Sequence, residues 1–404
     1  MNINYHYHAI KTLALKAEFG DFAAQKIAYY SQMVDDFDVL PWKSYTISLK
    51  EEPPAFFFEH GVAGESVLGG YWFRPVTTEI KTIDSITKSA KKFTITPFHF
   101  IPTVTLEELE RQNERRNYRC KKASECDHNS LIQQIKQKIR REKRDLMRIG
   151  MFLHTYADTY AHQEFSGMQG EENYAFIEST RSGMSKLDKY FYYDLPSIGH
   201  ANVGHLPDAA ADNFTYARIP YGGSGYTEHI IRDNVAEYEL CSRDILDFLC
   251  DLNGQPHLAD EQWGAFYQKI KNVNEQVFVN DGEIMDASKL NNIWNAAFQE
   301  EGYTYNYDKN AGDLSIKVKT IENVDMDELR KAGAEESDLY DIFSEKGKTA
   351  RSFAQIQYQV NEDFFQYNQL AYEHIAAVHG KFPSFEDILG DVTNSDSPEE
   401  GAIL

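Results

Sequence analysis

The 404-residue sequence contains only four cysteines, and no pair of them has the Cys-x-x-Cys spacing. A disulfide framework like that of small secreted domains is therefore not expected. Cys120 and Cys126, together with His128, could hold a metal, but free thiols in a cytoplasmic protein are the simpler interpretation. The first twenty residues lack a basic start followed by an apolar run, so the sequence predicts no cleaved secretion signal and a cytoplasmic location.

Long hydrophobic runs and positive charge are also scarce. No stretch approaches about 18 uninterrupted apolar residues, so no transmembrane segment is predicted. The formal net charge of −22 argues against non-specific attraction to nucleic acids, although bound metal ions can reverse the charge of a local site. The hydrophobic share of 42% and the aromatic share of 13% are still large enough for a folded core.

Several motifs of metal and nucleotide enzymes are absent. The sequence has no His-Asp doublet, no His-Glu-x-x-His motif and no pair of Glu-x-x-His motifs. These absences disfavour an HD-type phosphohydrolase, a common zinc protease and a carboxylate-bridged helical bundle. The glycine cluster at 222–225 lacks the lysine of a phosphate-binding loop. Other histidines and aspartates must therefore carry any metal chemistry.

Helical periodicity dominates the chain. Helices are predicted, in chain order, at 5–36 in two pieces, 129–167, 227–252, 260–278, 286–301 and 350–380. The first region divides at Phe19-Gly20-Asp21, where Asp21 can cap the second helix. Residues 40–105 are irregular, with β-like runs such as YTISL (45–49) and KFTIT (92–96). We expect a mainly α, multi-helix fold with a single core, loop-rich insertions and minor β structure.

These elements predict a division into domains. A helical metal-binding catalytic domain is expected over 1–300, with the irregular insertion at about 40–105. A helical extension at 301–380, with a small strand-and-helix insert at 317–333, should pack on it. The acidic tail at 381–404 has the composition of a disordered segment. The basic segment QKIRREKRDLMR is most simply a solvated helix face, and a phosphate- or membrane-facing stripe is the alternative.

One apolar segment carries three side chains that can bind metal. His154, Asp158 and His162 follow one another at intervals of four. On an α-helix, steps of four drift by only about 40°, so the three project from one edge over roughly 12 Å. That span is too long for one ion, but it suits two or three ions that share the central carboxylate. A lone histidine is usually an ordinary helix residue, but an ionised aspartate buried without partners would cost several kcal/mol, which coordination or a hydrogen-bond network would offset.

Partners for this helix lie in segments that look constrained. The candidates are His6 or His8 near the N-terminus, Asp35 or Asp36 at a helix end, His99 in the proline-flanked FHFIP, and His200, His205 and Asp208 in GHANVGHLPD. The other six histidines lack such company. Mixed His and Asp ligands favour open, water-bearing zinc sites, whereas structural zinc sites lean on cysteine.

The order of these residues resembles the zinc-dependent phospholipase C superfamily, which also contains the single-strand-specific zinc nucleases. The resemblance covers roughly residues 5–210 and rests on the order of NYHYHA, SQMVDD, FHFIP, HTYADTYAHQEFSG and GHANVGHLPD. The same stretches also look like a bacterial family that carries no assigned function.

The resemblance implies an all-α fold with two or three zinc ions, or other divalent metals. The implied ligands are Asp35, His99, His154 and Asp158 for one ion, His162, His200 or His205, and Asp208 for a second, and His6, with Asp158 shared, for a third. The implied activity is hydrolysis of a phosphodiester, either a single-stranded nucleic acid or a phospholipid head group, with Asp35 or Asp36 orienting or deprotonating the water. The alternative is a non-catalytic helical module, stapled by metal, that binds a protein partner.

Overall fold

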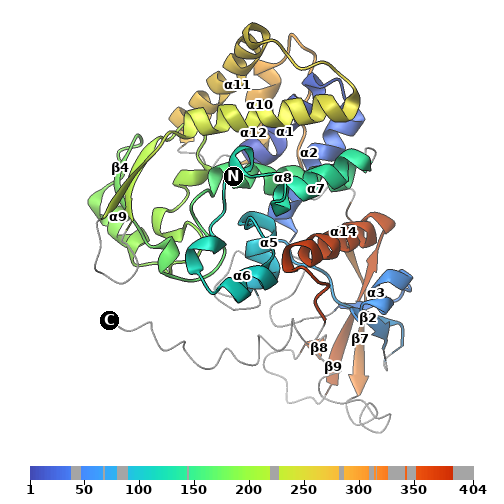
Figure 1. Ribbon diagram of the computed structural model, residues 1–404. Coiled ribbons are helices and arrows are strands. Elements are labelled where there is room, and N and C mark those ends of the chain that lie inside the picture. The colour runs from blue at the N-terminus through green and yellow to red at the C-terminus, as the bar shows by residue number, and fades with distance from the viewer. Residues whose placement is uncertain are drawn as a thin grey trace. The chain divides into compact units, whose positions relative to one another are not determined.

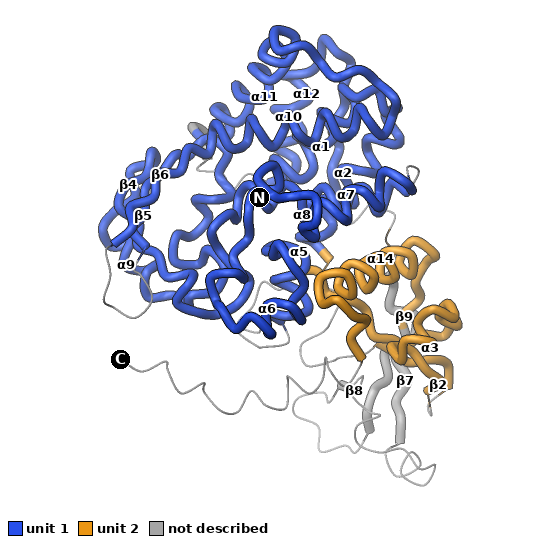
Figure 2. The backbone as a smooth tube through the Cα atoms, in the orientation of Figure 1, with its two compact units in different colours: residues 1–36, 79–309 blue, residues 37–78, 310–404 orange. Residues whose placement is uncertain are grey.

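A computed structural model of the chain describes residues 1–37, 47–66, 69–79, 90–142, 145–218, 227–281, 286–308, 314, 316–325, 342–343 and 352–384. These residues are mainly helical, with short strands, as the sequence predicts (Figure 1). The chain divides into two compact units, which Figure 2 shows in different colours. Unit 1 comprises residues 1–36 and 79–309, and unit 2 comprises residues 37–78 and 310–404.

Unit 1 consists of helices around the buried helix α8 (Leu146–Ala161) and a three-stranded antiparallel sheet, which lies at the left of Figure 1. The strands, in sheet order, are β4 (Ala175–Thr180), β5 (Phe214–Arg218) and β6 (Glu228–Arg232). The other described α-helices are α1 (Ile10–Lys16), α2 (Asp21–Asp36), α5 (Thr96–His99), α6 (Leu106–Gln112), α7 (Leu131–Arg141), α9 (Lys186–Tyr193), α10 (Asn234–Asn253), α11 (Asp260–Asp281) and α12 (Ala287–Ala297). The short π- and 3-10 helices are η1 (Asn4–Ala9), η3 (Lys91–Ile95), η4 (Arg115–Tyr118), η5 (Ala123–Glu125), η6 (Glu171–Asn173), η7 (Ala201–Val203) and η8 (Leu206–Asp208).

The burial of α8 follows from its sequence. Over 149–161, only His154 and Asp158 interrupt a run of apolar, aromatic and threonine residues, and every residue of this stretch is buried. A helix that is apolar on all sides is buried on all sides. The Asp145 carboxylate begins the helix by accepting a hydrogen bond from the Arg148 backbone N–H at 3.0 Å.

A glycine lets α8 cross α2 at close range. A Cβ atom at Gly150 would lie 2.4 Å from the Ile27 carbonyl oxygen and 2.8 Å from Tyr30 Cβ. Packed atoms do not approach so closely, so the crossing requires the missing side chain. One helical turn later, His154 Nδ1 lies 2.9 Å from the Ser31 carbonyl oxygen of α2. The close crossing of α2 and α8 therefore positions His154, the first of the three α8 residues that can bind metal.

The structure corrects the single helix predicted over 129–167. α7 and α8 are separate helices, because Asp145 caps a new helix, and α8 ends at its C-cap residue His162 rather than near Gly167. At this end, Nη2 of the buried Arg232 donates to the last two carbonyl oxygens of α8, at 3.0 and 3.1 Å. These bonds satisfy carbonyl groups that have no partner within the helix.

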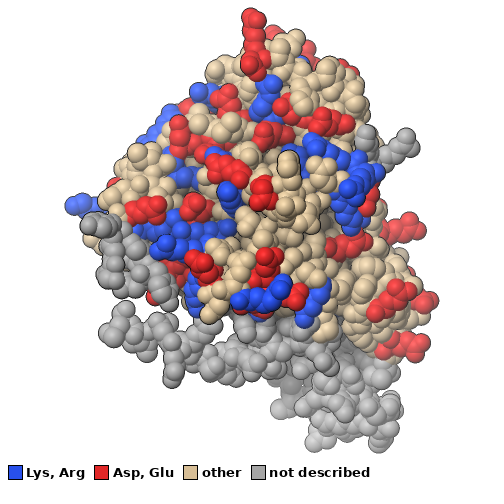
Figure 3. Space-filling model, in the orientation of Figure 1, with Lys and Arg blue, Asp and Glu red and all other residues tan. Residues whose placement is uncertain are grey.

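Acidic and basic side chains are interspersed on the face shown in Figure 3. A basic group at the right of this view lies over the end of α7, whose last turn contains Lys138, Arg140 and Arg141. Arg140 Nη2 lies 2.7 Å from Asp251 Oδ2, and both side chains are exposed. The described residues of α7 thus place basic side chains on a solvated helix face, and their charges suit the negative end of the helix dipole. Among the helices with described residues, none is both long and apolar enough to cross a bilayer.

Two π-helical segments deliver candidate ligands. η1 carries His6, and η3 leads directly into α5, which ends at His99. Segments of π-helix are rare and frequently occur at functional sites. The second segment corrects the strand-like interpretation of residues 92–96. Its β-branched and aromatic residues favour a strand by propensity, but burial of Phe93 and Thr94 in the tertiary structure outweighs that preference.

Unit 2 joins the first insertion to the C-terminal part of the chain, which corrects the expected single core with an extension from residue 301. Strand β1 pairs in parallel with β9, with Ser48 opposite Gln357, so its backbone groups find partners far along the chain. The sheet order is β2-β3-β1-β9-β7, with β8 paired to β9. The described elements of unit 2 are β1 (Ile47–Leu49), α3 (Ala55–Glu59), β2 (Ala63–Glu65), β3 (Tyr71–Phe73), β7 (Ile316–Asp325), β8 (Ile342–Phe343), β9 (Ser352–Val360) and α14 (Glu362–His379).

Two predicted helices begin later than expected. The region 227–252 holds β6 and then α10, and the region 350–380 holds β9 and then α14. Asp233 and Asn361 cap the two helices, each accepting a backbone N–H from three residues ahead. In β9, glutamines alternate with apolar residues over 355–360, and this period of two indicates a strand.

The remaining predictions have different outcomes. The helices predicted at 260–278 and 286–301 are present as α11 and α12, and 5–36 contains η1, α1 and α2. Strand β7 covers the first part of the insert predicted at 317–333. The tail predicted at 381–404 lies almost entirely outside the described residues.

Candidate metal centre

The polar edge of α8 lies among buried and half-buried histidines and aspartates that all belong to unit 1. α8 supplies His154 and Asp158 and ends at His162, in the register that the spacing of four predicts. The neighbouring segments supply His6 from η1, Asp35 from α2, His99 from α5, His200 from the N-cap of η7, and Asp208 from η8.

The Asp158 carboxylate lies between the other groups and is only 1% exposed. Its Oδ1 atom lies 2.5 Å from the amino nitrogen of Met1 and 3.1 Å from His6 Nε2. Its Oδ2 atom lies 3.2 Å from both His99 Nδ1 and His154 Nε2. The two oxygens therefore face different sets of neighbours, as the oxygens of a bridging carboxylate do.

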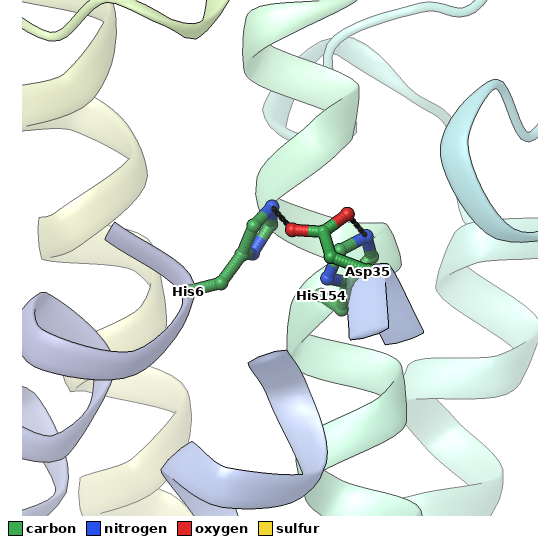
Figure 4. A group of neighbouring side chains, drawn as sticks. All are labelled: His6, Asp35 and His154. Atoms are coloured by element: carbon green, nitrogen blue, oxygen red, sulfur yellow. Dashed lines mark ion pairs between the residues drawn. The ribbon is translucent and has the colours of Figure 1, made fainter. Parts of the chain in front are cut away.

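A second carboxylate, that of Asp35, faces one nitrogen of each of two imidazole rings, those of His6 and His154 (Figure 4). Its oxygens are 3.6 Å from His154 Nε2 and 4.0 Å from His6 Nε2, and the two rings stack with centroids 3.7 Å apart. A third carboxylate, that of Glu79, contacts the other ring nitrogen of His99: Glu79 Oε2 lies 3.4 Å from His99 Nε2. Ligand atoms of Asp35, Glu79 and His99 all lie within 4.8 Å of one another, as do those of Asp35, His6 and His154.

His162, His200 and Asp208 form another compact group. Asp208 Oδ1 lies 3.0 Å from His162 Nε2, and Asp208 Oδ2 lies 3.5 Å from His200 Nε2. The Met1 amino nitrogen is 3.1 Å from Asp208 Oδ1 and 3.4 Å from His162 Nε2. This amino group therefore lies between the carboxylates of Asp158 and Asp208.

Backbone carbonyls fix the orientation of three of the histidine rings. The bonds are His154 Nδ1 to Ser31 O (2.9 Å), His162 Nδ1 to His99 O (2.7 Å) and His200 Nδ1 to Gly204 O (2.7 Å). A carbonyl oxygen only accepts, so each Nδ1 carries the hydrogen and donates it. In the neutral ring, Nε2 then presents a lone pair to the carboxylates described above. An outer N–H held by a carbonyl is the arrangement that orients metal-ligating histidines.

Burial and local charge set the protonation states. Burial lowers the pKa of His6 well below its usual range and that of His200 to about 4, so both rings are neutral at neutral pH. Burial alone would raise the pKa values of Asp158 and Asp208, but nearby histidines and the buried amino group hold both well below their usual range. Neutral imidazole and ionised carboxylate are the forms that bind metal.

Two groups titrate nearer to neutral pH. Burial disfavours the charged His99 ring, but its hydrogen bond to Asp158 and the charges of Glu79, Asp158 and Asp35 outweigh burial and raise its pKa to about 9. Burial raises the pKa of Asp35 to about 6, against the opposing effect of His154 and His99. Without a bound cation, His99 is therefore protonated at pH 7.

Aromatic packing supports the group around His162. The Phe100 ring stacks on the His162 ring with centroids 4.6 Å apart. A Cβ atom at Gly199 would lie 2.6 Å from the Phe100 ring, and Gly199 has a φ of 55°. Position 199 therefore requires glycine for two reasons: the Phe100 ring occupies the space that a Cβ atom would need, and its backbone, immediately before His200, is left-handed.

Three residues that the sequence offers as candidate metal ligands do not face the centre. His205 is exposed and belongs to no potential ligand group among the described residues. Asp36 Oδ2 accepts a hydrogen bond from the Tyr307 hydroxyl at 2.5 Å, and His8 Nε2 lies 2.9 Å from Asn291 Oδ1. Adjacent helical residues point about 100° apart, so Asp36 cannot share the direction of the aspartate before it.

Sequence reasoning missed two groups of this centre. Glu79 follows an irregular stretch, where no helical or strand period could mark it, and the amino group of Met1 belongs to no side-chain motif. Cys120 and Cys126 are free, and neither they nor His128 belongs to a potential ligand group in the described part of the chain.

Comparison with known families places this chain in one of them. The model of a family of unknown function, DUF6765, matches residues 1–382. The chain belongs to this family. The DUF6765 match contains every candidate ligand and reaches the end of α14. Neither the curated proteins nor the solved structures gave a match.

Proposed function

We propose that the protein is a metal-dependent phosphodiester hydrolase whose centre holds two or three zinc ions, or other divalent cations, in a fold of the zinc-dependent phospholipase C and nuclease type. One observation carries this proposal. The Nε2 atoms of His154, His162 and His200, whose Nδ1 atoms donate to backbone carbonyls, face carboxylate oxygens at 3.0 to 3.6 Å. An unprotonated Nε2 and a carboxylate oxygen repel each other at such distances unless a metal cation or a proton lies between them.

The charge of the centre also fits cations. Four carboxylates converge on it, those of Asp35, Glu79, Asp158 and Asp208. Among the described residues, the amino group of Met1 and the protonated ring of His99 face these carboxylates, and the ring of His6 is neutral. Divalent ions would neutralise the excess of negative charge, and the donor set of imidazole nitrogen and carboxylate oxygen is one that zinc binds.

The ligands of each ion would be those implied by the resemblance to the zinc-dependent phospholipase C superfamily. At the two places where that resemblance left alternative residues, the geometry favours one of them. Asp35 rather than Asp36 would bind, because it faces His154. His200 rather than His205 would complete the group of Asp208, because its Nε2 faces that carboxylate. Asp158, with its two oxygens facing different neighbours, would be the shared ligand.

In this proposal, the bound metal, Asp35 and the histidines would have different roles in hydrolysis. Bound zinc supplies a Lewis acid that lowers the pKa of water and neutralises charge on phosphoryl oxygens. Asp35, which faces His154 and His6, could orient that water or accept its proton. The carbonyl-held rings of His154, His162 and His200 keep their Nε2 atoms aimed at the centre without rearrangement.

Metal analysis and a substrate panel test the proposal. Protein purified without chelator should contain two or three zinc ions per chain by elemental mass spectrometry. It should hydrolyse at least one of bis(p-nitrophenyl) phosphate, single-stranded DNA, single-stranded RNA and phosphatidylcholine vesicles. Chelation should abolish that activity, and added zinc should restore it. The nucleic-acid and lipid arms distinguish the two sources of a phosphodiester.

A matched pair of variants separates catalysis from structure. Asp158→Asn should lose zinc and hydrolysis, whereas His205→Ala, which changes an exposed neighbour of the centre, should keep both. Wild-type protein without stoichiometric metal would overturn the proposal. Zinc without hydrolysis of any ester, with unfolding of Asp158→Asn, would instead favour the non-catalytic module stapled by metal.

A further inference from the structure

The two ring nitrogens of His99 face opposite sides of the candidate centre. Nδ1 faces inward, 3.2 Å from Asp158 Oδ2, 3.2 Å from His154 Nε2 and 3.9 Å from Asp35 Oδ1. Nε2 faces outward, 3.4 Å from Glu79 Oε2. A ring nitrogen that binds metal must direct its lone pair at the other ligands, so Nδ1 is the nitrogen available to the ion.

The outer nitrogen of His99 differs from those of the other histidines. His154, His162 and His200 each donate Nδ1–H to an uncharged backbone carbonyl. His99 instead directs its outer nitrogen at an anionic side chain, that of Glu79. The outer nitrogen of His162 also lies 3.6 Å from Asp158 Oδ2, but its hydrogen bond, at 2.7 Å, goes to the His99 carbonyl oxygen.

We propose that Glu79 is a positioning residue, which accepts the Nε2–H of His99 and so directs the Nδ1 lone pair of that ring at the metal proposed above. The inference rests on the proposed function. An ionised carboxylate can only accept, so its presence selects the Nε2–H tautomer. Its charge also makes the imidazole a stronger electron donor, as outer carboxylates do for zinc-bound histidine.

Direct ligation by Glu79 is the competing role, because its carboxylate lies within ligand range of Asp35 and His99. The two roles differ in what an amide can replace. Gln at position 79 keeps an oxygen that accepts Nε2–H, but an amide is a poor substitute for an anionic zinc ligand. Ala removes both the acceptor and the charge.

Zinc affinities of Glu79→Gln and Glu79→Ala, measured by competition with a chromogenic chelator, test the inference. Glu79→Ala should bind its weakest zinc ion about 10- to 100-fold less tightly than wild type, and Glu79→Gln should lose less, with no change in the number of ions bound. Glu110→Gln is the control, since Glu110 pairs with Lys92 in the segment that leads to His99 and carries the same charge. It should leave zinc affinity unchanged.

Nitrogen NMR of protein labelled at histidine supplies a second readout. In the zinc-loaded wild type, His99 should show a protonated Nε2 and a metal-bound Nδ1, and Glu79→Gln should keep this pattern. Equal losses in the Gln and Ala variants, with one ion fewer bound, would overturn positioning and assign Glu79 as a ligand. Unchanged affinity in Glu79→Ala would overturn the inference alone, provided that wild type binds zinc and hydrolyses an ester. A wild type without zinc would overturn both proposals.

Discussion

Gly150→Ala tests the packing that places His154. The new Cβ atom would lie 2.4 Å from the Ile27 carbonyl oxygen, whereas ordinary contact begins at 3.4 Å. The two helices must therefore separate by about 1 Å or distort. A similar displacement would stretch the 2.9 Å bond from His154 Nδ1 to the Ser31 carbonyl beyond hydrogen-bond range.

The expected loss can be estimated from these contacts. Overpacking costs about 1–3 kcal/mol, and a lost buried hydrogen bond costs about 1 kcal/mol more. Urea unfolding of the full chain, followed by circular dichroism, should therefore show a free energy of unfolding lower by about 2–4 kcal/mol. Zinc content should fall as well, because His154 loses the bond that orients its ring.

Gly264→Ala is the matched control. Gly264 is exposed in α11, and a Cβ atom there would meet nothing within 4 Å. Alanine favours helix over glycine by up to about 1 kcal/mol, so this variant should be as stable as wild type or more stable. If Gly150→Ala behaved like Gly264→Ala in both stability and zinc content, the close crossing of α2 and α8 would not be what positions His154.

Three further outcomes follow from the centre. Because His99 has a pKa of about 9 without a cation, zinc must displace its proton, so affinity measured by titration calorimetry should rise with pH up to about 9; a flat profile would contradict this. His200→Ala should lower the zinc bound per chain, whereas His205→Ala should not, and elemental analysis showing the reverse would exchange their roles. Tyr307→Phe removes the hydroxyl that donates to Asp36, so urea unfolding should show a loss of about 1.5–3 kcal/mol with zinc content unchanged; a loss of zinc would bring Asp36 into the centre.

The parts of the fold that the sequence predicts are those governed by local periodicity. The edge formed by His154, Asp158 and His162 follows from the helical repeat alone, and the structure places it as predicted. The division into two units does not follow from local pattern. It depends on the parallel pairing of β1 with β9, whose partners lie at opposite ends of the chain. The break between α7 and α8 depends on one capping residue, Asp145, within a charged run that is compatible with helix.

Which residue of each alternative pair faces the centre depends on the direction of its side chain and not on its spacing in the sequence. Asp35 and Asp36 are equivalent as letters in a sequence, but on α2 they point about 100° apart, so the packing of α2 against α8 decides which one faces His154. His200 and His205 likewise differ only through the short turns around them, which direct His200 Nδ1 to the Gly204 carbonyl and leave His205 exposed. A regular helix transmits its register along the chain, whereas a turn does not. Spacing can therefore identify the helical half of such a centre, and only the packed structure can identify the other half.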